Sequence, residues 1–423
     1  MGGAPGCQRT AGGVAAGSAR IDVHTAAEEG GEVTTVPSDL LTASRLGTGP
    51  ARPSTTNLTL LLERVHRGGP ASRAQLTRES GLNRSTVGAL VTELVRRGLV
   101  VEDDPDPTRQ VGRPSPIVRC SPEVAALAVV PETDAVTVAV VDLAGAVRRR
   151  FRCETGHPPS AAETVELVRG VLDEAAGPWQ LTGLGLAVPG LVRASDGLVR
   201  WAPHLEWRDE PLGTMLGEAT GLEVLAANDA NAGVLAEHLF GAAQDATQVL
   251  YLNGGPSGIG GGIIINGELV MGAEGYAGEF GHTQVAPAGE ESRELEAWVS
   301  RQRLLDLLGL ESASDDVLAD ALRHVEDEAL QAEVLRQLDA LALGVREMVN
   351  ALNPQRVVLG GFLGSLFERA PEHLLRGLQA QALRPSWESV SVVRAALGSD
   401  LLLVGAAELV FQRVIERASL TAA

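Results

Sequence analysis

Residues 71–100 read ASRAQLTRESGLNRSTVGALVTELVRRGLV, and this stretch decides the fold of the N-terminal part of the chain. Ser72 and Asn83 are favourable helix N-caps, and each precedes residues with helical spacing. Gly81 lies between the two segments, and Gly98 follows the second. The second segment carries one apolar stripe, formed by Val87, Leu90, Val91 and Leu94. The stretch therefore predicts two helices, over 72–80 and 83–98, joined by a tight turn.

The flanking residues extend this pattern. A helix is expected over 54–68, with Ser54 as its N-cap and Gly68-Gly69-Pro70 as its end. Leu99-Val100-Val101 predicts a short strand, and a turn is expected at Glu102-Asp103-Asp104-Pro105. Three helices followed by a strand and a wing are typical of a winged helix-turn-helix. A small three-helix bundle without a DNA role is the alternative.

Charge distribution favours the DNA-binding interpretation. The 423-residue chain has a net charge of −19, whereas residues 51–100 hold eight arginines and three glutamates, a net charge of +5. One basic segment in an acidic chain is expected of a small DNA-binding head on a larger body. The sequence contains no lysine, which excludes a Walker-type phosphate loop.

The apolar stripe of the third helix must face the core, so its opposite face is expected to meet the DNA groove. Arg84 could read guanine or hold a phosphate. Helix starts suit phosphates because their backbone N–H groups are unpaired, and four further residues are expected there. These are Ser72, Arg73, Ser85 and Thr86. Arg113, in Gly112-Arg113-Pro114 after the wing, is expected to enter an A·T-rich minor groove.

The rest of the chain differs from this segment in composition and in apolar periodicity. Residues 1–50 are rich in small residues without apolar periodicity, and we expect them either to be disordered or to result from a start codon assigned too far upstream. After Arg119, short β-rich runs alternate with helical stretches, which indicates an α/β fold. No apolar run is long enough to span a membrane and no signal peptide is evident, so we expect a cytoplasmic protein. Cys7, Cys120 and Cys153 lack metal-type spacing and are expected to be thiols.

Several motifs in this second region occur together and in a fixed order. They are VPGLV (188–192), APHLEW (202–207), ANDANA (227–232), SGIGGGI (257–263), GEFGH (278–282) and LEAW (295–298). In this order and spacing they resemble the ROK family (repressor, open reading frame, kinase). The resemblance covers about residues 54–415, and the chain is similar to the family's xylose- and N-acetylglucosamine-type repressors.

The resemblance implies an actin-like (ribonuclease H-like) α/β domain of two lobes, preceded by the winged helix-turn-helix. Domain limits follow from placing the motifs on that architecture. They are a disordered extension at 1–50, the DNA-binding domain with its Gly-Arg-Pro linker at 51–120, a first lobe at 121–227 plus 396–423, and a second lobe at 228–395.

The resemblance also implies a sugar site between the lobes. Asn228 and Asp229 would hydrogen-bond sugar hydroxyls, and Asp229 would be the general base in a kinase. Glu279, His282 and Glu296 would complete the site. Carboxylates and amides supply the acceptors that polyol hydroxyls need. Considered alone, Asn228-Asp229 would be a helix cap or turn.

Two departures from the family pattern bear on activity. Kinase members begin the body with Asp-x-Gly-Gly-Thr, where this chain has Val130-Pro131-Glu132-Thr133-Asp134. Glu132 would repel a triphosphate, so we expect no phosphoryl transfer, no cofactor and a vestigial role for Asp229. The family's Cys-rich zinc loop is replaced by residues 283–294, which contain no cysteine, so we expect no metal.

Together these features predict a transcriptional regulator of carbohydrate metabolism, a repressor rather than an enzyme. It is expected to bind double-stranded operator DNA as a homodimer or dimer of dimers, and to sense a sugar or sugar phosphate. One alternative is an ATP-dependent sugar kinase carrying a DNA-binding head. The other is a regulator that has lost its sugar and responds to a protein partner.

Overall fold

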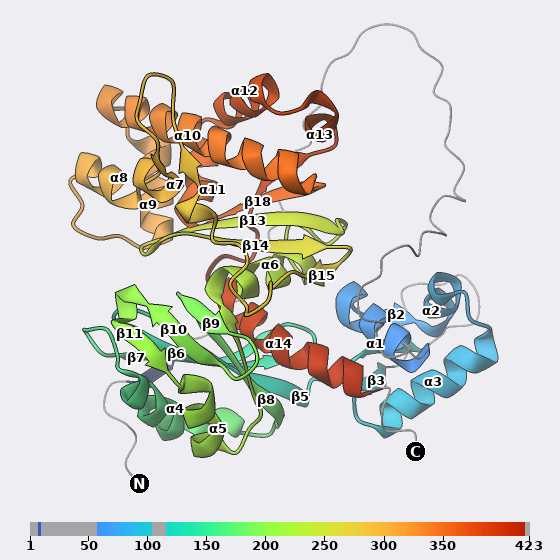
Figure 1. Cartoon of the computed structure of the whole chain (residues 1–423). Coiled ribbons are helices and arrows are strands. Elements are labelled where there is room, and N and C mark those ends of the chain that lie inside the picture. Colours follow the sequence, from blue (N-terminus) through green and yellow to red (C-terminus); the bar gives the residue numbers. More distant parts are fainter. Residues whose placement is uncertain (1–6, 10–56, 104–115, 419–423) are drawn as a thin grey trace, which may run out of the picture.

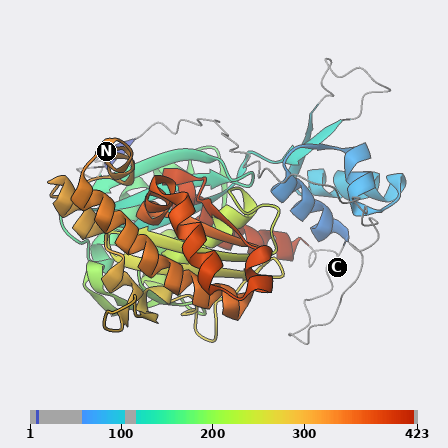
Figure 2. The same ribbon diagram turned by 90° about the horizontal axis from the view of Figure 1, so that it is seen from above.

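The computed structural model describes residues 7–9, 57–103 and 116–418. A small head lies beside a larger body that is built on two sheets, as Figures 1 and 2 show. Most of the expected N-terminal extension, and Arg113 in the expected minor-groove contact, lie outside the described residues.

The head has the expected order of three helices and a wing. Its elements are α1 (Asn57–Gly68), β2 (Ala71–Ser72), α2 (Arg73–Ser80), α3 (Arg84–Arg96), β3 (Val100–Asp103) and β4 (Ile117–Cys120). The predicted caps form, since Ser72 Oγ accepts from the Gln75 N–H and Asn83 Oδ1 accepts from the Thr86 N–H. Strands β2, β4 and β3 make a three-stranded antiparallel sheet.

The wing differs from the expectation in two respects. The turn expected at Glu102 begins later, because Glu102 and Asp103 pair with Val118 and Ile117 in the β3–β4 ladder. Gly112-Arg113-Pro114, which was expected after the wing, falls between β3 and β4 in the sequence and lies outside the described residues. Strand β4 itself was not predicted, and it pairs with β3 across residues 104–116.

The first body sheet has the strand order β1-β7-β6-β5-β8-β12. Its strands are β1 (Cys7–Arg9), β5 (Val124–Pro131), β6 (Ala135–Asp142), β7 (Val147–Glu154), β8 (Gln180–Val188) and β12 (Val224–Asn228). Strands β5 to β7 are antiparallel, and β8 and β12 run parallel to β5. A smaller three-stranded sheet comes before β12 in the sequence and consists of β9 (Leu191–Arg193), β10 (Leu198–Ala202) and β11 (Trp207–Glu210). The helices of this part of the chain are α4 (Ala161–Ala176) and α5 (Leu212–Thr220).

The second body sheet repeats this design with the order β15-β14-β13-β18-β19. Its strands are β13 (Gln248–Gly255), β14 (Gly258–Ile265), β15 (Glu268–Leu269), β18 (Arg356–Gly360) and β19 (Ser391–Arg394). Here too a hairpin is followed by parallel strands reached through helices. The chain between and beside these strands forms a two-stranded sheet and seven α-helices. They are β16 (Gln284–Val285), β17 (Arg293–Glu294), α7 (Leu295–Trp298), α8 (Arg301–Leu308), α9 (Asp315–His324), α10 (Glu328–Leu352), α11 (Gly361–Arg369), α12 (Pro371–Gln381) and α13 (Arg384–Glu388).

Two helices connect the parts of the molecule. Helix α6 (Asp229–Leu239) lies between the two sheets, and α14 (Leu401–Arg417) runs from this junction to the head (Figure 1). The head core is continuous with that of the first sheet, because buried Leu94 and Val118 belong to one apolar cluster with Phe411 and Ile415 of α14. The head is therefore packed against the body rather than joined to it by the chain alone.

The cysteines only partly match the expectation. Cys120 is a buried free thiol, whereas Cys153 is disulfide-bonded, so the prediction of thiols throughout is wrong. Strand β1 places Cys7 opposite Cys153, a pairing that their distance in the sequence did not suggest. Among the described helices, none combines the length and the apolar composition that a membrane span requires.

Candidate functional site

The predicted sugar-binding residues gather around the start of α6. Asn228 is the N-cap of this helix; its Oδ1 accepts from the Ala230 N–H at 2.8 Å, and its Nδ2 donates to the Gly190 carbonyl at 2.9 Å. Gly190 lies just after the end of β8, so the Asn228 side-chain amide links the start of α6 to the end of this strand of the first sheet. The helix-cap role considered for Asn228 is thus real, and the cap also fixes the position of Asp229.

Asp229 is the first residue of α6 and is half-buried. Its Oδ1 accepts from the Ala230 N–H at 2.8 Å. Burial, with a smaller contribution from the nearby Glu279 carboxylate, raises the pKa of Asp229 to about 6, although the backbone hydrogen bond opposes this. A carboxylate with this pKa can accept a hydrogen bond from a bound hydroxyl at neutral pH.

Two further carboxylates come from the second sheet's side. Glu279 precedes a 3₁₀ turn at Phe280–His282. Its pKa is raised, chiefly by burial and also by the Glu296 carboxylate, whereas His282 acts in the opposite direction. Glu296 lies in α7, and its Oε2 accepts from the Ile259 N–H at 3.2 Å, next to Gly258 in the β13–β14 hairpin. Asp229, Glu279 and Glu296 therefore form one acidic group, in which each carboxylate influences the next.

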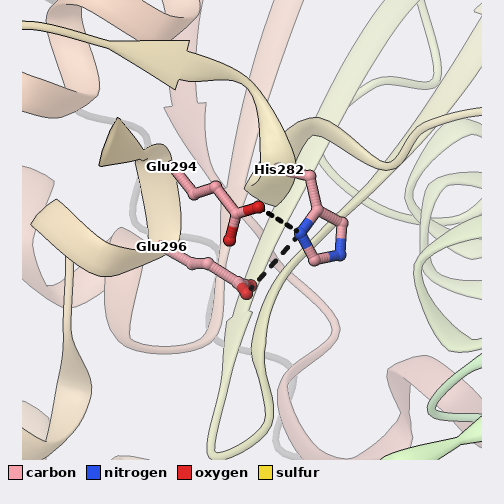
Figure 3. A group of neighbouring side chains, drawn as sticks. All are labelled: His282, Glu294 and Glu296. Carbon is pink, nitrogen blue, oxygen red and sulfur yellow. Dashed lines mark ion pairs between the residues drawn. The ribbon is translucent and has the colours of Figure 1, made fainter. Parts of the chain in front are cut away.

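His282 is exposed and lies beside two glutamates (Figure 3). Its Nδ1 is 3.5 Å from Glu294 Oε1 and 3.9 Å from Glu296 Oε1. Glu294 was missed by sequence reasoning, since it stands in the cysteine-free segment; the β16–β17 pairing brings it opposite Gln284 and close to His282. The one available signal was its spacing of two residues from Glu296.

These three side chains could hold a metal ion in principle, because one ligand atom from each lies within 4.8 Å of the others. The set offers one imidazole and two carboxylates, all partly or fully exposed. It contains no thiolate, so it differs from the cysteine-rich loop that this place holds in the resembled family. The distances are also those of an ordinary ion pair, so the arrangement does not require a metal.

The β5–β6 hairpin carries Glu132, Thr133 and Asp134, which the resemblance aligned with the phosphate-binding turn of the kinases. The Glu132 N–H donates to the Ala135 carbonyl at 2.8 Å, which makes a tight turn. Arg152 forms ion pairs with Glu132, Asp134 and Glu154, and Thr137 Oγ1 donates to Glu132 at 2.6 Å. This hairpin presents carboxylates rather than free N–H groups, which is unfavourable for a triphosphate.

The predicted DNA-binding residues lie at the starts of two head helices. Ser72 and Arg73 begin α2, and Arg84, Ser85 and Thr86 begin α3. Arg84 and Ser85 are exposed, and among the described residues Arg84 has no ion-pair partner. Arg73 differs, because its guanidinium is held by Glu102 of the wing through Nε at 2.6 Å. Of the two arginines of this set that the structure describes, Arg84 is therefore the more available to contact DNA.

Comparison with known proteins gives two matches that together cover most of the chain. A model described as "ROK family" matches residues 132–413, and one described as "MarR family" matches residues 55–110. Among curated proteins, a putative xylose repressor of Caldicellulosiruptor sp. (strain Rt8B.4) is 28% identical over 398 residues, covering 85% of this chain and 96% of that protein. A glucokinase of Thermotoga maritima is 30% identical over 295 residues, covering 63% and 90%.

Solved structures agree on the architecture. A ROK family transcriptional regulator, described as a homolog of the E. coli Mlc protein, superposes with a TM-score of 0.70 at 24% identity and covers 86% of this chain and 97% of its own. That likeness establishes the fold, including the head. A ROK family glucokinase from Streptomyces griseus, solved with glucose and AMPPNP, gives a TM-score of 0.57 at 27% identity and covers 68% and 99%.

Proposed function

Because this chain belongs to the ROK family, we propose that it is a DNA-binding repressor of carbohydrate metabolism whose activity depends on a sugar or sugar phosphate. The observation that carries the proposal is the combination of an exposed, arginine-bearing α3 with an acidic group at the start of α6. The relatives support it, since the xylose repressor match extends over more of the chain than the body alone contains.

The proposal assigns sugar hydroxyls to Asn228, Asp229, Glu279, His282 and Glu296. Their carboxylates and amide supply acceptors in a half-buried setting, where an unmatched polar group is costly. It assigns DNA phosphates and bases to Ser72, Arg84, Ser85 and Thr86, with Arg113 in the minor groove. Arg73 would reach DNA only after releasing Glu102, so we give it a smaller share.

The body is proposed to sense rather than to phosphorylate its sugar. Glu132 and Asp134 in the β5–β6 hairpin would repel the phosphates of ATP. Asp229, at the start of α6, would still be available to bind the sugar. We propose the expected division into lobes at 121–227 plus 396–423 and at 228–395, a homodimer, and a cytoplasmic site of action. A kinase retaining a DNA-binding head is the second candidate, motivated by Asp229 and by the kinase relatives.

Operator binding tests the proposal. The full chain should bind a duplex from the region upstream of its own gene at least tenfold more tightly than a scrambled duplex at about 150 mM salt. Affinity should fall steeply as salt rises, because phosphate contacts release counterions. Equal affinity for the two duplexes would refute the repressor function.

The kinase candidate is tested separately. A coupled assay of ADP release across hexoses should show no turnover above background, with the Asp229→Asn variant as the blank. Turnover that disappears in Asp229→Asn would establish the kinase and displace the proposal. Thermal shift against the same sugars also addresses a regulator that has lost its sugar, since no stabilisation by any of them would favour it.

A further inference from the structure

His66 joins the head to the body through a buried contact. It lies in α1 of the head and is 3% exposed. Its Nδ1 is 2.6 Å from the Leu143 carbonyl, and its Nε2 is 3.0 Å from Glu408 Oε2. Its ring packs edge-on against Phe240 at 5.4 Å and Phe411 at 6.1 Å between centroids. All four partners belong to the body.

The contact is a charged one. Both ring nitrogens of His66 face acceptors, and only a protonated imidazolium can donate to both. Burial opposes this charge, but the Glu408 carboxylate and the Cys120 thiol outweigh it and raise the pKa of His66 to about 10. A buried charge that loses its partner is strongly unfavourable, so the geometry around His66 is tightly held.

The partners of His66 come from two different parts of the body. Leu143 directly follows β6, and Glu408 and Phe411 lie in α14, whose apolar residues pack in the same core cluster as strands of the first sheet. Phe240 is the C-cap of α6. His66 therefore touches the first sheet's elements on one side and the end of α6 on the other.

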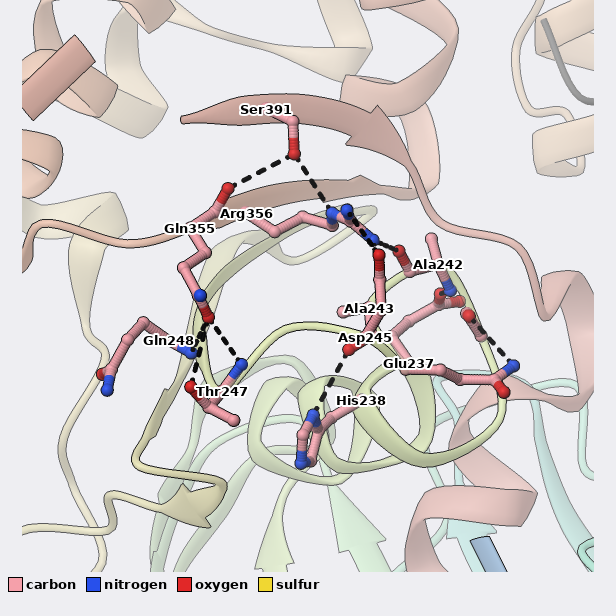
Figure 4. A network of polar contacts seen from close by, with 12 residues as sticks. Glu237, His238, Ala242, Ala243, Asp245, Thr247, Gln248, Gln355, Arg356 and Ser391 are labelled. Carbon is pink, nitrogen blue, oxygen red and sulfur yellow. Dashed lines mark hydrogen bonds and ion pairs between the residues drawn. The ribbon is translucent and has the colours of Figure 1, made fainter. Parts of the chain in front are cut away.

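The C-terminal end of α6 is fixed to the second sheet (Figure 4). Glu237 accepts from the Ala242 N–H at 2.6 Å and from the Ala396 N–H at 2.8 Å. Arg356, at the start of β18, donates to the Ala242 carbonyl at 2.7 Å and pairs with Asp245. Phe240 must therefore follow any movement of the second sheet.

The other end of α6 carries Asn228 and Asp229 of the proposed sugar site. Between the two ends, α6 crosses α14 with backbone contact, since a Cβ on Gly405 would lie 2.0 Å from the Ala232 carbonyl oxygen. This close crossing is a natural pivot, because neither helix can shift toward the other there. Displacement at one end of α6 is then expected at the other.

Space for such a movement exists beside His66. An open cavity of about 370 Å³ lies between head and body, lined by Arg67 and Gly69 of the head and by Asp142 and Gln244 of the body. Because this pocket opens to solvent, its head and body walls can shift relative to one another by exchanging water, without compressing the packed core.

We propose that Phe240 and His66 couple the proposed sugar site to the head. A sugar that draws the two lobes together turns α6 about its crossing with α14, shifts Phe240 against His66, and so changes the position of α1 and of the DNA-reading helix. The inference rests on the proposed function, and it adds the route by which sugar binding reaches the head.

The test compares Phe240→Leu with Phe367→Leu in the full chain. Both phenylalanines are partly buried residues associated with the second sheet, but Phe367 packs in that sheet's own core. His66→Gln provides a second variant. His373→Gln controls for the loss of a histidine–carboxylate pair, here with Asp339 at 2.7 Å, although the side chain of His373 is partly exposed and that of His66 is buried. The probes are D-xylose, D-glucose and a labelled duplex from upstream of the chain's own gene.

In the unaltered protein, the sugar that binds should weaken the duplex affinity by about tenfold or more, within the usual range of allosteric coupling. Phe240→Leu and His66→Gln should reduce this ratio to about twofold or less, while sugar affinity by calorimetry and sugar-free DNA affinity stay within about threefold. The control variants should keep the full ratio.

The outcomes separate the inference from the function. A full sugar response in both Phe240→Leu and His66→Gln would overturn the coupling and leave the repressor standing. No sugar response in the unaltered protein would refute sugar-controlled repression, and the coupling with it. Hydrogen exchange without sugar checks the contact itself: amides of 57–68 should exchange faster in Phe240→Leu than in Phe367→Leu, and equal rates would contradict the proposal.

Discussion

The β5–β6 and β13–β14 hairpins occupy equivalent places in the two body sheets, each next to two parallel strands, yet their chemistry is opposite. The first is closed by ion pairs between Arg152 and the carboxylates of Glu132 and Asp134. The second has glycine at 255 and 258, and the Glu296 carboxylate lies against it. One hairpin satisfies its own charges, whereas the other keeps a carboxylate available to a ligand.

This difference explains how a kinase-like fold can serve as a sensor. Phosphoryl transfer needs phosphate-binding groups as well as a sugar site, while sensing needs the sugar site alone. A hairpin that does not bind phosphate can carry carboxylates, and in the first hairpin these pair with Arg152. The acidic group around Asp229, by contrast, keeps half-buried carboxylates whose raised pKa values show that their charged forms disfavour the folded state.

The largest expected effect is on sugar binding by Asp229→Asn. Replacing a charged acceptor by a neutral amide should weaken the sugar affinity by roughly 10- to 100-fold, about 1.4–2.8 kcal/mol. Isothermal titration calorimetry measures this directly. Asp134→Asn, in the first hairpin, should leave the affinity unchanged; an equal loss in both variants would erase the distinction between the two hairpins.

The same Asp229→Asn variant should be more stable than the unaltered protein at neutral pH. The pKa of Asp229 rises from 3.8 to about 6 on folding, so its contribution to stability is present below pH 3.8 and is lost as pH rises through 6. The variant should therefore gain about 1–3 kcal/mol at pH 7.5, and the gain should narrow toward pH 5. Thermal unfolding at both pH values checks this, and a loss of stability at pH 7.5 would contradict it.

Gly258→Ala should disturb the second hairpin at its contact with Glu296. Gly258 has φ +129°, and a Cβ there would lie 2.4 Å from Glu296 Oε2, so the carboxylate must move. Sugar affinity should fall about tenfold, or about 1.4 kcal/mol. Thr133→Ala, on the exposed turn of the first hairpin, is the matched control, and calorimetry should detect no change in it.

The smallest effect is expected for Glu132→Ala. Partly exposed ion pairs contribute about 0–1 kcal/mol, so the free energy of unfolding should drop by no more than that. Sugar affinity and sugar-free DNA binding should remain as they were. A loss of sugar binding in this variant would show that the first hairpin still takes part in ligand recognition.

Much of the fold follows from local sequence signals. The caps Ser72 and Asn83, with the apolar stripe of α3, predicted the head because each acts within a few residues. The actin-like body was predicted by resemblance, through motifs such as ANDANA at 227–232, and the family match over 132–413 supports it. Periodicity alone indicated only an α/β fold.

The features that sequence did not predict depend on long-range pairing. Arg73 was expected to be available to DNA, but it is held by Glu102 of β3, a strand of the same sheet as β2, which precedes α2. His66 and Glu408 are separated by 342 positions, and neither stands in a motif. Cys153 in its disulfide, and Glu294 beside His282, likewise follow from strand pairing that no local pattern encodes.

Sugar-dependent operator binding is the central claim, and fluorescence anisotropy of the labelled upstream duplex with and without sugar tests it most directly. In the unaltered protein, saturating sugar should weaken duplex binding by about tenfold or more, and in Asp229→Asn the same sugar concentration should change it by less than about twofold. An unaltered protein whose duplex affinity is the same with every sugar tested, although it binds the duplex specifically, would contradict the claim.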